Sequence, residues 1–301
     1  MDGRNQVREY LDSSDKFTEP EIESVEEGKN NVNYIFSSDE GKYVLRKARK
    51  AKEHETLRNE RVVLEFLEAK RIDSAPRSIN LDPQKNIHTV SFVGRESVWA
   101  EKLNQDDLRN WAKQLAQINT LTFEQFKDFC EESGYDSIKP EKQEDKIEGL
   151  YRDLEEIRGS GYKELTAFVE KKLDEVAFRE PLELDQPFLM HSDIANSTRK
   201  TGDSFFFIDW EFAEFKYNQA SDLAVILSQR DFTEQQIETL KNTFREELEI
   251  TDNFEEKLLR AKKFRHLFNI VWCLKRASKG VEERKMVSYA ERQSKKFSEN
   301  I

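Results

Sequence analysis

The most informative stretch of the chain is Met190-His191-Ser192-Asp193-Ile194-Ala195-Asn196, which is followed by Phe207-Ile208-Asp209-Trp210-Glu211. Each stretch begins with apolar, strand-like residues and ends in a carboxylate, and a polar loop separates the two. An isolated aspartate usually caps a turn. Two carboxylates supplied in this way also suit phosphoryl transfer, in which one orients or deprotonates a hydroxyl and the other holds magnesium.

The first hundred residues predict a small antiparallel sheet. Apolar and polar residues alternate in five segments, and Gly- and Asn-containing turns separate the first three. A helix is predicted over residues 53–70, because the apolar residues there recur at helical spacing. The predicted strands cover residues 22–25, 32–36, 42–46, 79–81 and 87–93. Together these elements form a sheet with one packed helix.

The rest of the chain is predicted to be mainly helical, apart from the region of residues 187–210 that contains the opening stretch. The predicted helices cover residues 106–121, 145–157, 162–176, 220–229, 233–248, 254–278 and 282–297. The fold class is therefore α+β. We expect an N-terminal lobe over residues 1–94 and a C-terminal lobe over residues 95–301.

Composition limits the classes of function. Of the 301 residues, 37% are hydrophobic and 36% charged, which is typical of a globular protein with a charged surface. The net charge of −11 argues against general affinity for nucleic acid or anionic membranes. Cys130 and Cys273 supply neither a disulfide framework nor a zinc site. Since residues 1–15 do not resemble a secretory signal, we expect a cytoplasmic protein.

In the opening stretch, His191-x-Asp193 is followed by an asparagine. This pattern resembles the catalytic loop of aminoglycoside phosphotransferases and choline kinase-like enzymes. Residues 208–213 are similar to the metal-binding segment of that family, and Asp222-Leu223-Ala224 matches the short motif that follows it. The resemblance implies a protein-kinase-like bilobal fold, with a five-stranded antiparallel N-terminal lobe, one helix in that lobe, and a larger, mainly helical C-terminal lobe.

The resemblance also implies a nucleotide site in the N-terminal lobe. Residues 28–34, with Asn31 and Asn33, occupy the place of the loop that covers the nucleotide. Residues 43–46 are similar to the third-strand motif, whose basic residue, here Arg46, reaches the phosphates of ATP. Arginine can hold phosphate oxygens bidentately.

Two further parts of the nucleotide site are implied by the same resemblance. Glu60 falls on the following helix, where a carboxylate positions Arg46, although Glu53, Glu55 and Glu65 are alternatives. The segment of Phe92 and Val93 is similar to the hinge strand, whose backbone would bond to adenine.

One position departs from the family. Its asparagine normally lies five residues after the catalytic aspartate, and position 198 is a threonine. Asn196 lies three residues after Asp193 and precedes Asp209 by 13 residues, close to the spacing in the family. We therefore predict a loop shortened by two residues, with Asn196 and Asp209 as magnesium ligands. His191 is expected to brace this loop; direct acid–base catalysis is the alternative.

We thus predict a kinase that uses ATP and Mg²⁺ to phosphorylate a hydroxyl of a small molecule such as choline, ethanolamine or an aminoglycoside, as a monomer or homodimer. Asp193 would accept the hydroxyl proton. Aromatic and acidic residues near Asp209 could receive a cationic acceptor, or could pack between helices: Trp210, Glu211, Phe212, Phe215 and Tyr217. The shortened loop favours one alternative, a nucleotide-binding pseudokinase that acts as a scaffold or sensor. A protein kinase proper would carry Asp-Phe-Gly at residues 209–211.

Overall fold

The computed structural model describes residues 3–28, 30–49, 54–99, 102–140, 142–177, 186–250 and 253–299. The chain forms two compact units. The first contains Met1–Val98, Glu132–Tyr135 and Ser197–Ala213, and the second contains Trp99–Glu131, Asp136–Asn196 and Glu214–Ile301. The chain therefore passes between the units several times. Over the described residues, none of the helices has the length and apolar character needed to cross a membrane.

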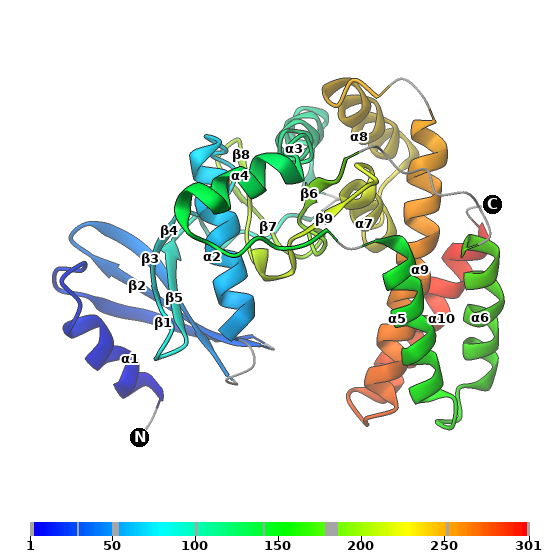
Figure 1. Ribbon diagram of the computed structural model, residues 1–301, viewed down its shortest axis with the longest axis horizontal. Coiled ribbons are helices and arrows are strands. Elements are labelled where there is room, and N and C mark those ends of the chain that lie inside the picture. Colours follow the sequence, from blue (N-terminus) through cyan, green and yellow to red (C-terminus); the bar gives the residue numbers. More distant parts are fainter. Residues whose placement is uncertain are drawn as a thin grey trace. The chain divides into compact units, whose positions relative to one another are not determined.

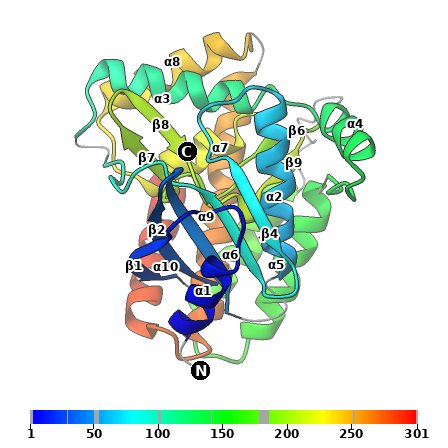
Figure 2. The same ribbon diagram turned by 90° about the vertical axis from the view of Figure 1, so that its left-hand side faces the viewer.

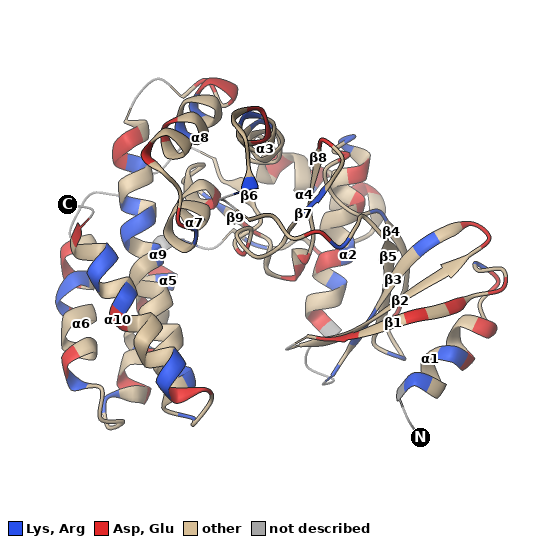
Figure 3. Cartoon of the chain, turned by 180° about the vertical axis from the view of Figure 1, so that it is seen from behind, with Lys and Arg blue, Asp and Glu red and all other residues tan. Residues whose placement is uncertain are grey.

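The first unit is built on a five-stranded antiparallel sheet in the order β1-β2-β3-β5-β4 (Figure 1). This sheet confirms the five predicted strands and their antiparallel arrangement. Its strands are β1 (Glu21–Glu27), β2 (Asn31–Ser38), β3 (Gly41–Ala48), β4 (Ser78–Asp82) and β5 (Ile87–Ser91). Acidic segments run along β1, which forms one edge of the sheet (Figure 3). Charged residues on an edge strand oppose pairing with other chains.

Two helices cover opposite faces of this sheet. The sequence analysis missed α1 (Gly3–Asp12), which lies against the sheet in both Figure 1 and Figure 2. Its Val7, Tyr10 and Leu11 are buried in one cluster with Leu45 of β3. Successive residues of a strand face opposite sides, so Arg46 points to the other face, where it contacts α2 (His54–Ala69).

A short hairpin from late in the chain completes the first unit. It consists of β7 (Thr198–Thr201) and β8 (Ser204–Phe207), and the short helix η3 (Trp210–Phe212) follows. The amide of Phe207 donates to the carbonyl of Ser74, 2.7 Å away. Gly94 lies beside this hairpin with φ +114°, and a Cβ there would come within 2.4 Å of Oγ1 of Thr201. Glycine is therefore required at this position.

The second unit is mainly helical, which confirms the predicted α+β fold class. The structure adds one helix that the sequence analysis missed, α4, which buries Phe126 and Cys130. Two short strands, β6 and β9, pair antiparallel. The elements are α3 (Gln105–Ile118), α4 (Phe123–Ser133), α5 (Gln143–Ile157), α6 (Lys163–Ala177), β6 (Phe188–Met190), β9 (Glu214–Lys216), α7 (Ser221–Gln229), α8 (Glu234–Glu247), α9 (Phe254–Ala277) and α10 (Glu283–Glu299).

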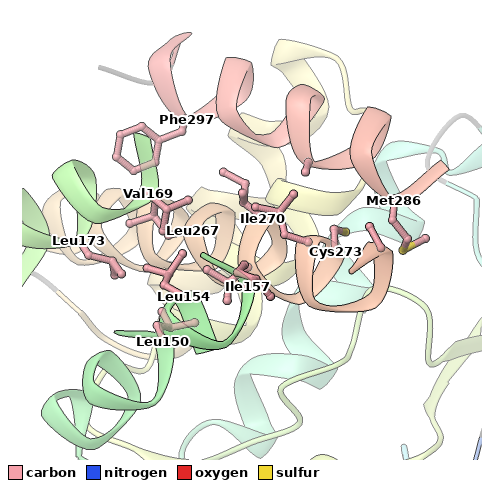
Figure 4. Close-up of a cluster of buried hydrophobic side chains, with 14 residues drawn as sticks. Leu150, Leu154, Ile157, Val169, Leu173, Leu267, Ile270, Cys273, Met286 and Phe297 are labelled. Carbon is pink, nitrogen blue, oxygen red and sulfur yellow. The ribbon is translucent and has the colours of Figure 1, made fainter. Parts of the chain in front are cut away.

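The core of the second unit gathers around α9. Side chains from α5, α6, α9 and α10 meet in one apolar cluster, shown in Figure 4, that includes Leu154, Val169, Ile270 and Phe297. Because α9 is packed on several sides, its position is fixed by burial of apolar surface. This fixed helix carries Arg265, which contacts the predicted catalytic loop.

Candidate active site

The loop that follows β6 is held by a buried carboxylate. Asp222, near the start of α7, is fully buried, and its carboxylate accepts hydrogen bonds from the backbone amides of His191 (2.8 Å) and Ser192 (2.9 Å). It also accepts from Nδ2 of Asn119, 3.1 Å away. Backbone N–H groups satisfy an ionised carboxylate well. Asp222 therefore fixes the conformation of the loop that presents Asp193.

The loop itself turns sharply before Asp193. Ser192 has φ +67°, in the left-handed region that few residues other than glycine adopt. The buried imidazole of His191 accepts, at Nδ1, from the amide of Asp193 at 3.3 Å. This contact lies within the loop and suits the bracing role predicted for His191.

Asp193 lies beside a cationic side chain that the sequence analysis did not identify. Nη2 of Arg265 is 3.8 Å from Oδ1 of Asp193, and Nη1 of Arg265 donates to the carbonyl of Ser192 at 3.3 Å. Burial lowers the pKa of Arg265, and the negative charge of Asp193 opposes that shift. No motif surrounds Arg265 in the sequence, so only the tertiary structure identifies it.

A second charged group flanks the loop. Oγ of Ser192 donates to Oε1 of Glu214 at 2.5 Å, and Nζ of Lys216 donates to the same oxygen at 2.8 Å. Lys146, from α5, pairs with the other oxygen of Glu214. Burial tends to raise the pKa of Glu214, but the two lysines outweigh it and hold the pKa well below its usual range. Glu214 is thus an ionised carboxylate with two cationic partners.

The end of the loop contains the two candidates for the family's asparagine. Thr198 is buried in β7, where its Cα partner is Phe207. Asn196 is exposed, and its Nδ2 lies 3.3 Å from the side-chain amide of Gln229. Thr198 is paired within the hairpin and carries a hydroxyl, so Asn196 is the one of the two that can present a side-chain amide near the end of the loop. Its role as a metal ligand stays a prediction.

In the first unit, Arg46 lies among three carboxylates. It pairs with Glu60 of α2 and with Asp209, and Nη2 lies 3.7 Å from Oε2 of Glu211. Burial tends to lower the pKa of Arg46, but the carboxylates outweigh it and raise the pKa. The structure thus brings together Arg46, Glu60 and Asp209, which are up to 163 positions apart.

Glu60 is the centre of a wider hydrogen-bond network. Its carboxylate accepts from the amide of Trp210 at 3.2 Å and lies 3.1 Å from Nδ1 of His88. Glu60 and His88 are both buried. Glu53 lies outside the described residues, and Glu65 pairs with Arg61 instead. Among the alternatives that the structure describes, Glu60 is the one that pairs with Arg46.

The segment after Asp209 is tied to the start of β2. Asp209 has φ +69°. The two oxygens of Glu211 accept from Nδ2 of Asn30 and Nδ2 of Asn31, each at 2.9 Å. Burial and the neighbouring Asp209 raise the pKa of Glu211. Asn31, predicted to lie in the nucleotide-covering loop, thus anchors Glu211, a contact with no signal in the sequence.

The other predicted nucleotide contacts lie near the same sheet. The amide of Gly28 donates to the carbonyl of Asn31 at 2.9 Å and closes the loop between β1 and β2; Lys29 of this loop lies outside the described residues. Asn33 has a buried Oδ1 that lacks a hydrogen-bond partner in the described structure. At the predicted hinge, the Phe92 amide donates to the carbonyl of Lys42, and the Val93 carbonyl accepts from Thr201.

Two of the four aromatic residues near Asp209 pack inside the protein, whereas Phe212 is exposed and Tyr217 is half-buried. Trp210 is fully buried and donates from Nε1 to the carbonyl of Phe207. Phe215 is also buried and packs against Phe123 and Phe126. Glu211 is bound to asparagines, as described above. Of the two readings drawn from the sequence, packing therefore holds for Trp210 and Phe215, which cannot form a cage for a cation.

Comparison with known proteins gives one family and one fold. A profile of the phosphotransferase enzyme family, APH, matches residues 21–256. No curated protein matches the chain by sequence. Among solved structures, the choline kinase LicA from Streptococcus pneumoniae is similar, with a TM-score of 0.68 and 16% identity over 97% of this chain and 99% of that chain.

Two structures of an aminoglycoside phosphotransferase are similar as well. The gentamicin complex of APH(2")-IIa gives a TM-score of 0.70 and 16% identity over 98% of this chain and 96% of that one. Its streptomycin–ATP ternary complex gives 0.68 and 16%, over 91% and 90%. At these identities the likeness shows the fold alone, and it confirms the predicted protein-kinase-like architecture.

Proposed function

The chain belongs to the phosphotransferase enzyme family, as its resemblance predicted, and on this basis we propose that it is an ATP- and Mg²⁺-dependent kinase for the hydroxyl of a small molecule. The observation that carries the proposal is the cluster of Arg46, Glu60 and Asp209. Arg46 contacts both Glu60 and Asp209 there, and the three residues come from separate motifs. The structural relatives solved with ATP and with aminoglycosides support the same assignment.

The residues of the first unit fit a site for magnesium and phosphate. Three carboxylates surround the single guanidinium of Arg46, so this region is rich in negative charge. Over the described residues, no three or more His, Cys, Asp or Glu side chains gather in a metal-ligating group. Mg²⁺ does not require one, because it binds one or two carboxylates together with substrate phosphates and water. Asp209 and Asn196 would hold the ion, which neutralises charge on the phosphates.

The remaining steps are assigned to side chains of this chain. Arg46, positioned by Glu60, neutralises phosphate oxygens. Asp193 orients the acceptor hydroxyl and takes its proton while the acceptor oxygen bonds to the γ-phosphorus; the bond from that phosphorus to the bridging oxygen breaks, and ADP leaves. Asp222 and His191 hold Asp193 in place. We propose residues 1–94 as the nucleotide-binding lobe and residues 95–301 as the catalytic lobe; the cytoplasmic location stays a prediction.

One observation favours a second candidate. The loop is predicted to be two residues shorter than in the family, and the side-chain amide of Asn196 lies against that of Gln229. If Asn196 stays in that contact, metal binding would be weak, and the chain would act as a nucleotide-binding pseudokinase.

The test is ATP consumption by the purified protein with Mg²⁺ and a panel of hydroxyl compounds: choline, ethanolamine, aminoglycosides, sugars and homoserine. Asp193→Ala should lower turnover by about 10²- to 10⁴-fold, the usual contribution of a general base, and leave nucleotide binding intact. Asp209→Ala should weaken Mg²⁺-dependent nucleotide binding. Asp231→Ala is the matched control, because Asp231 is an exposed aspartate paired with Lys296. Full turnover by the Asp193 variant would rule out this mechanism; ATP binding without transfer would favour the pseudokinase.

A further inference from the structure

From the groups around Asp193 we propose that the acceptor carries an oxyanion, either a carboxylate or a phosphate, which binds to Arg265. The proposal rests on the proposed function, because it names the class of acceptor for the site around Asp193. All the groups involved belong to the second unit.

Arg265 is held mainly by uncharged partners. Its Nη1 donates to the carbonyl of Ser192. The side-chain oxygen of Gln229, in the amide orientation in which it faces Arg265, accepts from Nη2 at 2.6 Å and from Nε at 3.2 Å. The carboxylate of Asp193 is 3.8 Å away, which is longer than a hydrogen bond. A guanidinium has five N–H donors in a planar fork that matches a carboxylate or phosphate. Arg265 therefore has both the charge and the geometry to bind an oxyanion.

The carboxylates near Asp193 are already bound to other groups. Glu214 pairs with Lys146 and Lys216. Asp222 is buried and accepts from N–H donors. Among the described residues around the loop, an incoming ammonium group would thus have to compete with two lysines at Glu214, with N–H donors at Asp222 and with the nearby Arg265 at Asp193. An incoming oxyanion would meet cations instead.

The exposed aromatic rings next to Arg265 lead to the same conclusion. Phe268 and Trp272 of α9 are 37% and 39% exposed, and residues four apart lie on the same helix face. The guanidinium carbon of Arg265 is 5.2 Å from the centre of the Phe268 ring, and that of Arg276 is 5.0 Å from the centre of the Trp272 ring. Basic segments recur along α9 (Figure 3). A quaternary ammonium ligand requires open ring faces, whereas these faces already hold cations of the protein.

The experiment compares three three-carbon alcohols whose second terminal group is anionic, neutral or cationic. The protein is saturated with Mg²⁺ and a non-hydrolysable ATP analogue, so that oxyanions cannot bind at the nucleotide site. Binding of 3-hydroxypropanoate, 1,3-propanediol and 3-aminopropan-1-ol is then measured by ligand-detected NMR. Glycerol 3-phosphate against glycerol forms a second arm, which distinguishes a phosphate from a carboxylate. We expect an oxyanion compound to bind at least about 10-fold more tightly than its neutral and cationic counterparts.

Variants of α9 test the role of Arg265. Arg265→Gln should weaken oxyanion binding by about 10- to 100-fold, and Arg265→Lys, which keeps the charge without the planar fork, should be intermediate. Arg260→Gln is the control, because Arg260 is on the same helix and pairs with Glu256. Thermal unfolding of each variant verifies folding.

Three results would overturn the proposal: equal or tighter binding of the amine, no binding of either oxyanion, or unchanged binding by a folded Arg265→Gln. A fall in kcat with unchanged acceptor KM in that variant would instead assign Arg265 to the transferred phosphoryl group. Since binding is measured without turnover, failure of the kinase assignment and failure of this proposal remain distinguishable.

Discussion

The residues proposed to bind the nucleotide and those proposed to bind the acceptor differ in their balance of charge. In the first unit a single cation, Arg46, lies among Glu60, Asp209 and Glu211. In the second unit three carboxylates, those of Asp193, Glu214 and Asp222, lie among two lysines and Arg265, so the two signs of charge balance. An excess of carboxylates suits Mg²⁺ bound together with phosphate, and cations within reach suit an anionic ligand. We propose that the first environment serves the nucleotide and the second the acceptor.

The two groups of residues also differ in how many partners each charged or polar group has. Arg46 keeps two carboxylates if the third is removed. The backbone amides of His191 and Ser192, by contrast, both donate to the single carboxylate of Asp222. A mutation in the first unit should therefore be buffered by neighbouring groups, and a mutation of Asp222 should not be.

The largest effect is expected for Asp222→Ala, which leaves buried N–H donors without an acceptor. We expect a loss of about 3–5 kcal/mol in the free energy of unfolding, in the range for uncompensated buried groups. Turnover should also fall, because the loop would no longer present Asp193. Denaturant unfolding and kcat measure the two effects. Asp231→Ala serves as the control, and a loss no greater than that control would contradict the role of Asp222.

A smaller effect is expected for Glu60→Ala. Glu60 is buried, but Arg46 would retain Asp209 and Glu211, so we expect a loss of about 2–3 kcal/mol. Nucleotide affinity should fall as well, because Arg46 would lose the partner that positions it. Unfolding and nucleotide titration test this, with Glu68→Ala on the exposed face of α2 as the control. A loss larger than that of Asp222→Ala would reverse the comparison between the two units.

The smallest effect concerns pH and the packing of α9 on α10. His266 is buried and bonds to Gln293 at 2.6 Å, and burial lowers its pKa to about 4. Since the unfolded chain has a histidine pKa near 6.5 and so binds more protons between pH 6.5 and 4, stability should fall as pH falls through that window. Between pH 6.5 and about 5 we expect a loss of about 1–2 kcal/mol from this residue. Denaturant unfolding of the wild type and of His266→Gln across this range should show a weaker pH dependence of stability in the variant. Equal pH dependence in the two proteins would contradict this role of His266.

Much of the fold could be predicted from the sequence because it depends on local patterns. Alternation of apolar residues gave the five strands, and helical spacing gave α2 and most of the later helices. The missed helix α1 buries only Val7, Tyr10 and Leu11 in a polar segment, and its partner surface is the sheet. Its stability comes from tertiary packing, which a local pattern does not reveal.

The site residues were likewise predictable only where a local motif marks them. Arg46, Glu60 and Asp209 lie in motifs with fixed spacing, and the structure brings them together. His88 and Arg265 were missed because each acts through a partner far away in the sequence, Glu60 for His88 and Ser192 for Arg265. A buried histidine or a helical arginine has many ordinary roles, so only its contacts reveal a connection to the site.

The hairpin of β7 and β8 has a consequence for how the protein is made. Ser197–Ala213 belongs to the first unit, although 98 residues of that unit precede the second unit in the chain. During synthesis, the sheet leaves the ribosome long before the strands that complete its unit. The first unit therefore cannot finish folding until residue 213 has emerged. An isolated fragment of residues 1–98 would lack Asp209, a partner of Arg46, and would leave the contact of Ser74 with Phe207 unmade.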